Sequence, residues 1–129
     1  MEEQPVYRWQ SKNILVVEDD ESSAYLLGTF LKETGASISF TADGDEAVDY
    51  VRRHPETDLV LMDIHLPQKD GLTATREIKS FASDVVVIAQ TAYAFSTNHQ
   101  EALMAGCDDY LTKPLNMSLL LDKKNGYLS

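Results

Sequence analysis

The sequence predicts a doubly wound α/β domain built from five parallel strands and five helices. Short apolar runs rich in β-branched residues alternate with segments whose apolar residues recur at helical spacing. Two of the runs, 59–62 and 85–89, are continuously apolar, as central parallel strands covered on both faces are. A regular alternation of strand and helix is typical of a parallel sheet with crossover helices.

The first half of the chain provides two strands and two helices. The run ILVV at 14–17 predicts the first strand, and residues 21–35 predict a helix that a glycine ends. Ile38 and Phe40 alternate with serines, which indicates a half-buried second strand. Residues 43–54 predict a second helix with one apolar face, because its alanine and valines recur at helical spacing.

The second half continues this alternation. Three further strands are expected, at 59–62, at 85–89 and around Tyr110 and Leu111. Three further helices are expected, at 72–81, 95–106 and 117–128. Residues 1–12 are mostly polar and are interpreted as a tail or linker. The domain is therefore expected to span 13–129.

Composition limits the class of protein. The chain has 129 residues, which fits one domain with a single substantial core. Its 21 acids against 11 bases give a net charge of −10, which argues against nucleic acid as a partner. No apolar run is long enough to span a membrane, so no direct membrane contact is expected. Cys107 is the single cysteine and has no internal disulfide partner, which makes a cytoplasmic location the default expectation.

Polar residues follow several of the predicted strands. Glu18 and Asp19 come directly after the first strand and Asp63 ends the third, while Thr91 and Lys113 follow the fourth and fifth. The carboxyl ends of parallel strands meet at one edge of a sheet, where ligands bind. Two carboxylates ~4 Å apart repel by about 4 kcal/mol at an effective dielectric constant of 20, which one lysine cannot offset for three acids. An oxygen-only ligand set favours Mg²⁺ as the counter-ion.

The same residues stand in motifs that resemble the response-regulator receiver domain of two-component signalling. The resemblance runs from about Asn13 to the last predicted helix, and the matching segments are ILVVEDD, LVLMDIHLPQKDG, IAQTAYA and DDYLTKP. It implies a flavodoxin-like sheet with strand order 2-1-3-4-5. It also implies that Asp63 is the phosphoacceptor and that Mg²⁺ is held by Asp19, Asp63 and the backbone carbonyl of His65. Glu18 would then act largely through a water molecule on the metal.

Further roles are also implied by the resemblance. Lys113, expected in a cis bond with Pro114, would pair with the phosphoryl group, and Thr91 would bond another of its oxygens. Thr91 and Tyr110 would form the conformational switch. His65, Ala92 and Tyr93 would border the path by which water and phosphoryl donors approach. We expect the two rings to screen the attacking water and so to slow loss of the phosphate.

The resemblance also concerns partners and context. The phosphoryl donor would be a histidine kinase or a histidine phosphotransfer domain, and the chain would catalyse only its own phosphorylation and dephosphorylation. Its motifs look most like receivers attached to hybrid sensor histidine kinases, although a free-standing receiver would look similar. A weak dimer through the fourth helix, fifth strand and fifth helix is compatible with the family.

Two other classes of protein remain as alternatives at this stage. A metal-dependent phosphohydrolase that resembles haloacid dehalogenases would place its nucleophile on the first strand, with a second acid two residues later. Here Asp63 ends the third predicted strand and the residue two positions on is His65. A receiver-like interaction module without phosphorylation is the other alternative, and the intact acid, hydroxyl and lysine set argues against it. Neither GxGxxG nor GxxxxGK[ST] is present, which disfavours a nucleotide-binding domain.

Overall fold

The computed structural model describes residues 12–64, 66, 70–91 and 96–112. The strands are β1 (Asn13–Val17), β2 (Ser37–Thr41), β3 (Leu59–Asp63), β4 (Val86–Thr91) and β5 (Asp109–Thr112). The helices are α1 (Glu21–Lys32), α2 (Gly44–Arg53), α3 (Gly71–Phe81) and α4 (Ser96–Ala105). The fifth helix that the sequence predicts, at 117–128, lies outside the described residues.

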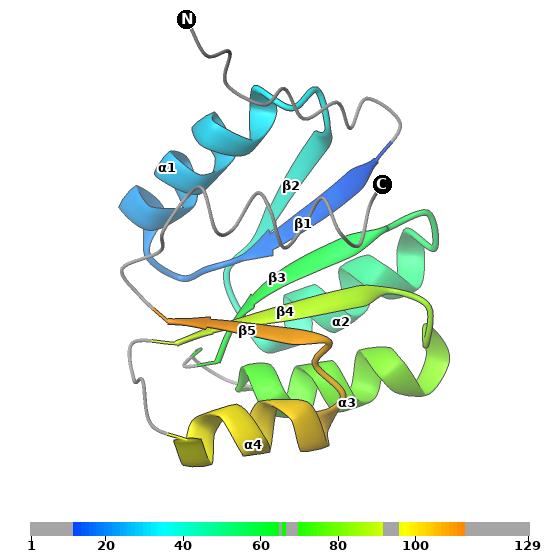
Figure 1. Ribbon diagram of the computed structural model, residues 1–129. Helices are drawn as coiled ribbons and strands as arrows, with labels where there is room; N and C mark the ends of the chain where they lie inside the picture. Colours follow the sequence, from blue (N-terminus) through cyan, green and yellow to red (C-terminus); the bar gives the residue numbers. More distant parts are fainter. Residues whose placement is uncertain (1–11, 65, 67–69, 92–95, 113–129) are drawn as a thin grey trace, which may run out of the picture.

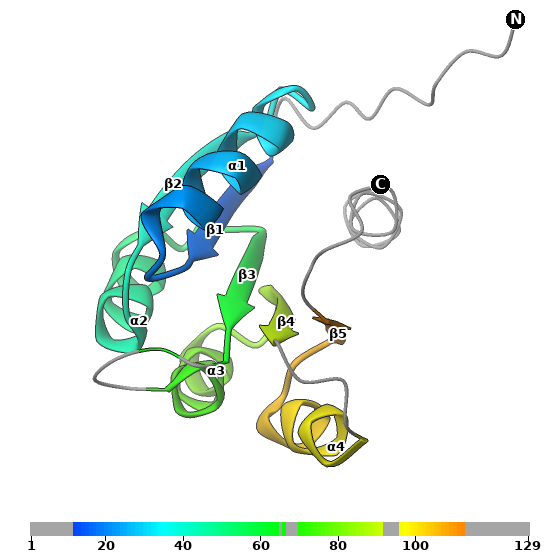
Figure 2. The same cartoon turned by 90° about the vertical axis from the view of Figure 1, so that its left-hand side faces the viewer.

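The five strands form one parallel sheet in the order β2-β1-β3-β4-β5, which confirms the predicted fold class (Figure 1). In the edge-on view α1 covers one face of the sheet, while α2, α3 and α4 lie on the other (Figure 2). This is the doubly wound arrangement, in which each crossover helix packs back onto the sheet it connects.

Each face of the sheet has its own apolar core. Val60 and Met62 of β3 point toward the face covered by α2, α3 and α4, where Ala74 and Ile78 of α3 pack on them. The alternate residues of the same strands, including Leu61, point toward the face of α1. Since side chains alternate along a strand, the residues of a central strand must be apolar on both sides, which explains the continuous apolar runs.

Three of the helices, α1, α2 and α3, begin where the sequence offers a capping carboxylate. The side chains of Asp20, Asp43 and Asp70 each accept a hydrogen bond from a backbone N–H in the first turn of α1, α2 and α3. The loops that precede these three helices leave the carboxyl edge of the sheet. Capping there fixes how each chain segment turns away from the strand end, and so positions the residues that surround the edge.

Some boundaries differ from those predicted. α1 ends at Lys32 rather than continuing to residue 35, and Gly35 takes a positive φ of 87° in the turn that follows. The Phe40 side chain, on the edge strand β2, lies against Gly28 of α1 and remains 44% exposed. Cys107 is buried.

Candidate acid site at the carboxyl edge of the sheet

Three carboxylates meet where β1 and β3 end. Oxygen atoms of Glu18, Asp19 and Asp63 all lie within 4.8 Å of one another. Glu18 and Asp63 are 5% and 4% exposed, whereas Asp19 is exposed to solvent. The predicted convergence of these acids is therefore confirmed.

The sheet register explains why the acids meet. Val17 of β1 is aligned with Met62 of β3, so Glu18 and Asp63 follow at the same level of the sheet. The backbone N–H of Glu18 donates to the carbonyl of Thr41 at 3.0 Å, which extends the pairing with β2 by one residue. A side-chain oxygen of Glu18 accepts from the backbone N–H of Asp20 at 3.2 Å. The loop after β1 is thus held so that Asp19 reaches the same place.

The donor set fits a hard divalent cation. All three side chains offer carboxylate oxygens, and their mutual repulsion in a largely buried setting favours a counter-ion. Thiolate and imidazole ligands, which suit zinc, are absent from this cluster among the described residues. One exposed member leaves the cluster open to solvent on the side of Asp19, which suits Mg²⁺ because that ion usually retains water molecules.

Gly71 allows the segment after β3 to pack tightly against the strand that carries Asp63. Its N–H donates to the carbonyl of Ile64 at 3.0 Å. A Cβ atom at Gly71 would lie 2.1 Å from the backbone oxygen of Asp63 and 2.9 Å from the Cα of Ile64. Only glycine fits there. In the sequence, Gly71 stands out only as the last residue of the motif LVLMDIHLPQKDG, and this steric role was missed because it depends on the approach of two backbone segments.

Gln90 is a second residue at this edge that sequence reasoning missed. It is aligned with Asp63 across the β3–β4 pairing and is fully buried. The available signal was a polar amide at the end of an otherwise apolar run. The predicted strand at 85–89 ended one residue before Gln90, whereas β4 continues to Thr91.

The remaining predicted site residues are placed only in part. Thr91 is the last residue of β4, at the same edge as the acids, and its side chain is not described. Tyr110 lies in β5 and packs partly buried against the core on the side of α2, α3 and α4; desolvation by burial raises the pKa of its hydroxyl. The other predicted site residues, His65, Ala92, Tyr93 and Lys113, and Pro114 with its predicted cis bond, lie outside the described residues.

A five-stranded parallel sheet in 2-1-3-4-5 order, with a cluster of carboxylates at its carboxyl edge, defines the class of flavodoxin-like domains with an acidic ligand site. The model of the response regulator receiver domain family matches residues 14–125, so the chain belongs to that family.

Similar proteins agree with this assignment. The polar-differentiation response regulator DivK of Brucella ovis is 32% identical over 120 residues, which cover 92% of this chain and 97% of DivK. A second similar protein is the receiver domain of a sensor histidine kinase from Pseudomonas aeruginosa PAO1, which was solved with a magnesium ion in its active site cleft. Its TM-score is 0.84 at 34% identity, and the match covers 92% of this chain and 98% of that one.

A yeast structure is similar as well. It is the receiver domain of a response regulator from Saccharomyces cerevisiae in complex with the histidine phosphotransfer protein upstream of it. Its TM-score is 0.87 at 29% identity, and the match covers 97% of this chain and 92% of that one. Among the described residues of our chain, the helices are all too short or too polar to cross a membrane.

Proposed function

We propose that this receiver domain accepts a phosphoryl group on the carboxylate of Asp63. The observation that carries the proposal is the cluster of Glu18, Asp19 and Asp63 at the carboxyl edge, two of whose members are buried. Asp63 sits at the end of a fully buried strand, where a carboxylate is costly to desolvate. Such a cost is expected where the group has a chemical role.

The donor in this proposal is a phosphohistidine on a histidine kinase or a histidine phosphotransfer domain. A carboxylate oxygen of Asp63 attacks phosphorus in line, an oxygen–phosphorus bond forms, and the nitrogen–phosphorus bond breaks. The imidazole nitrogen keeps the electron pair of the broken bond. Positioning and electrostatic stabilisation supply most of the catalysis in such a transfer.

Glu18, Asp19 and Asp63 would hold Mg²⁺ together with the backbone carbonyl of His65. When bound, the cation would neutralise negative charge on the carboxylates and on the phosphoryl oxygens. Lys113 would pair with the phosphoryl group and Thr91 would donate a hydrogen bond to it, and both contacts would stabilise the negative charge on its oxygens. The side chains of Lys113 and Thr91 lie outside the described residues, so these roles depend on the sequence motifs.

The conformational response would run from Thr91 to Tyr110. Movement of the threonine toward the phosphoryl group would free space that the Tyr110 ring fills, and the face of α4 and β5 would change shape. The partial burial of Tyr110 against the core is compatible with a ring that has two positions. The same face would support a weak dimer.

The proposal also covers the limits of the domain and the location of the protein in the cell. We propose that residues 1–12 form a linker, that 13–129 form the receiver, and that the protein acts in the cytoplasm, in hybrid-kinase or free-standing form. Loss of phosphate by hydrolysis at the same site would complete the cycle, and it is the only other reaction that we assign to the domain.

Incubation with Mg²⁺ and a small-molecule phosphodonor tests the proposal. The wild type should gain one phosphate that is labile in acid and in alkali. Asp63→Asn keeps the shape of the side chain but lacks the nucleophile, and it should not be labelled. Asp84→Asn, in an exposed loop, is the matched control and should be labelled like the wild type. Acyl phosphate that persists in Asp63→Asn would refute the assignment.

A further inference from the structure

We infer that Gln90 is a positioning residue of the acid site, and that its amide N–H donates to the phosphoryl group or carboxylate oxygen of Asp63 in the activated state. This inference rests on the proposed function of Asp63. It concerns a residue to which the receiver motifs of the sequence assign no role.

The first observation is the burial of an amide without partners. The Gln90 side chain is 0% exposed, and neither its amide nitrogen nor its amide oxygen has a hydrogen-bond partner among the residues that the structure describes. A buried polar group without a partner costs stability, whereas an apolar side chain of similar shape would not. A methionine or leucine at this position would therefore be the more stable choice for the resting fold.

The second observation is the position of the amide relative to Asp63. The two residues are aligned across the β3–β4 pairing, and the N–H of Ile64 donates to the carbonyl of Gln90 at 3.0 Å. Residues aligned in a parallel pair point to the same face of the sheet, on strands about 4.8 Å apart. The two methylenes of glutamine are long enough to bring its amide to the carboxylate of its neighbour.

The third observation is the apolar setting of Gln90. Ile88 precedes it by two residues on the same strand, and Leu111 is aligned with it on β5; both belong to the core on the side of α1. Among the described residues, the side chains that form this core are all apolar. The acid edge is the polar region that the amide can reach within the described structure.

Phosphorylation would place a stronger acceptor within reach of the amide. It replaces a carboxylate by a phosphoryl group with about one more negative charge and three strong acceptor oxygens. A change of the Gln90 side-chain torsion angles would then exchange an unpartnered amide for a charge-assisted hydrogen bond, which is stronger than one between neutral groups. The amide would thus favour the activated state because it is unsatisfied in the resting state.

Gln90→Met and Thr41→Val test the inference as a matched pair. The Thr41 hydroxyl is the other buried side-chain group without a hydrogen-bond partner in the described structure, and β2 lies two strands from β3. Both substitutions delete an unsatisfied group with little change in volume. Neither should lower the resting stability, measured by urea denaturation without ligand.

Binding of beryllofluoride with Mg²⁺, a mimic of the phosphorylated state, separates the two variants. Measured by titration calorimetry, Gln90→Met should bind about tenfold or more weakly than the wild type, and Thr41→Val within about twofold. In the wild type, the side-chain NH₂ resonances of Gln90 should shift on binding.

Each other result has a definite meaning. Equal binding by Gln90→Met and wild type, or unchanged NH₂ resonances, would overturn the inference and leave the proposed function intact. A less stable Gln90→Met with unchanged binding would assign the amide to a buried structural water only. Absence of binding by the wild type would refute the proposed function, and the inference with it.

Discussion

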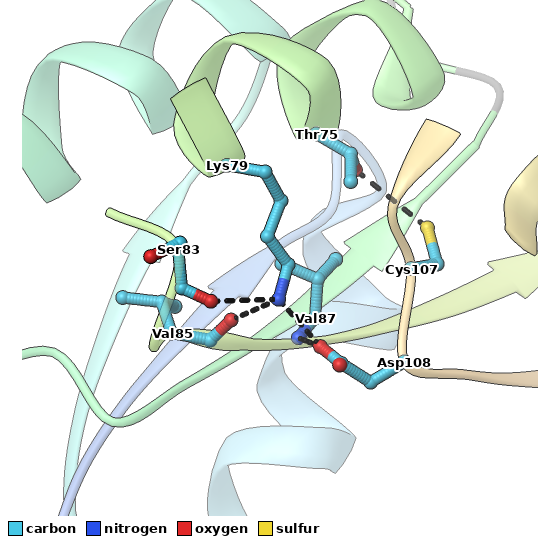
Figure 3. A network of polar contacts seen from close by, with 7 residues as sticks. All are labelled: Thr75, Lys79, Ser83, Val85, Val87, Cys107 and Asp108. Carbon is cyan, nitrogen blue, oxygen red and sulfur yellow. Dashed lines mark hydrogen bonds and ion pairs between the residues drawn. The ribbon is translucent and has the colours of Figure 1, made fainter. Parts of the chain in front are cut away.

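The ammonium nitrogen of Lys79 lies 2.8 Å from Oδ2 of Asp108, and this contact joins α3 to the turn that leads into β5 (Figure 3). Lys79 also donates to the carbonyl of Val85 at 2.6 Å, while the same Asp108 oxygen accepts from the N–H of Val87 at 2.8 Å. The pair therefore holds the amino end of β4 from two sides. It lies at the opposite edge of the sheet from the acid site.

Lys79→Met should lower the free energy of unfolding by about 1–2 kcal/mol, because it removes charged hydrogen bonds that are partly shielded from solvent. The side chains of Lys79 and Asp108 are 19% and 34% exposed. The matched control is Arg53→Met, which breaks the more exposed i,i+4 pair with Asp49 and should cost less than about 0.5 kcal/mol. Urea denaturation measures both. Equal losses would show that the Lys79 contacts add nothing beyond an exposed ion pair.

Mg²⁺ should raise the thermal midpoint of the wild type, because a bound cation relieves the repulsion among Glu18, Asp19 and Asp63. Asp63→Asn removes one of the three charges, so its midpoint should be higher than that of the wild type without metal and should respond less to Mg²⁺. Asp84→Asn should behave like the wild type in both conditions. Midpoints that do not respond to metal or to the Asp63 substitution would count against a clustered acid site.

Gly71→Ala should destabilise the fold by about 2–3 kcal/mol or more, because the added methyl group meets the backbone of Asp63 and Ile64, which cannot move aside. Gly28→Ala is the control. Its Cβ would lie 2.4 Å from the Cζ atom of Phe40, the far end of a ring that is 44% exposed and can swing away.

Because alanine also favours the helix by up to about 1 kcal/mol, we expect little net change for Gly28→Ala. The two variants are compared by urea denaturation and by their response to Mg²⁺. Gly71→Ala should also lose most of the stabilisation by Mg²⁺, since the displaced strand end carries Asp63. A Gly71→Ala variant as stable as Gly28→Ala would contradict the steric argument.

Cys107 should react slowly with thiol reagents in the native state. Its sulfur is buried and donates to Oγ1 of Thr75 at 3.8 Å, and desolvation by burial raises the pKa of the thiol (Figure 3). Because the thiolate is the reactive form, a raised pKa leaves less of it at any given pH below that pKa. Alkylation at pH 7.5 should be on the order of a hundredfold slower than in urea. Similar rates in both conditions would show that the thiol is accessible in the native protein.

The lifetime of the phosphate should depend on His65 and Tyr93. The resemblance to receiver domains implies that these rings would border the path of the attacking water, and loss of an in-line water changes rates strongly. The double variant His65→Ala, Tyr93→Ala should therefore lose its phosphate faster than the wild type. Decay is followed after removal of the donor, with Mg²⁺ present and without a phosphatase. Equal or slower decay in the double variant would show that the rings do not protect the phosphate.

The sequence alone was sufficient for the fold class and for the acids of the site. Continuous apolar runs determine buried parallel strands, because a central strand must be apolar on both faces. Once the strands are known, Glu18, Asp19 and Asp63 must lie at one edge, since each follows or ends a strand of the same parallel sheet. These are local patterns, which is why they could be read without coordinates.

Only the tertiary structure decided the contacts between segments that are far apart in the chain. The steric need for glycine at position 71 arises only when the helix start approaches the Asp63 backbone within contact distance. Lys79 and Asp108 are 29 residues apart, and nothing in either neighbourhood marks them as partners. The alignment of Gln90 with Asp63 depends on the register of β3 against β4. A register shift of one residue would turn every side chain to the other face, and only the packing of both cores fixes it.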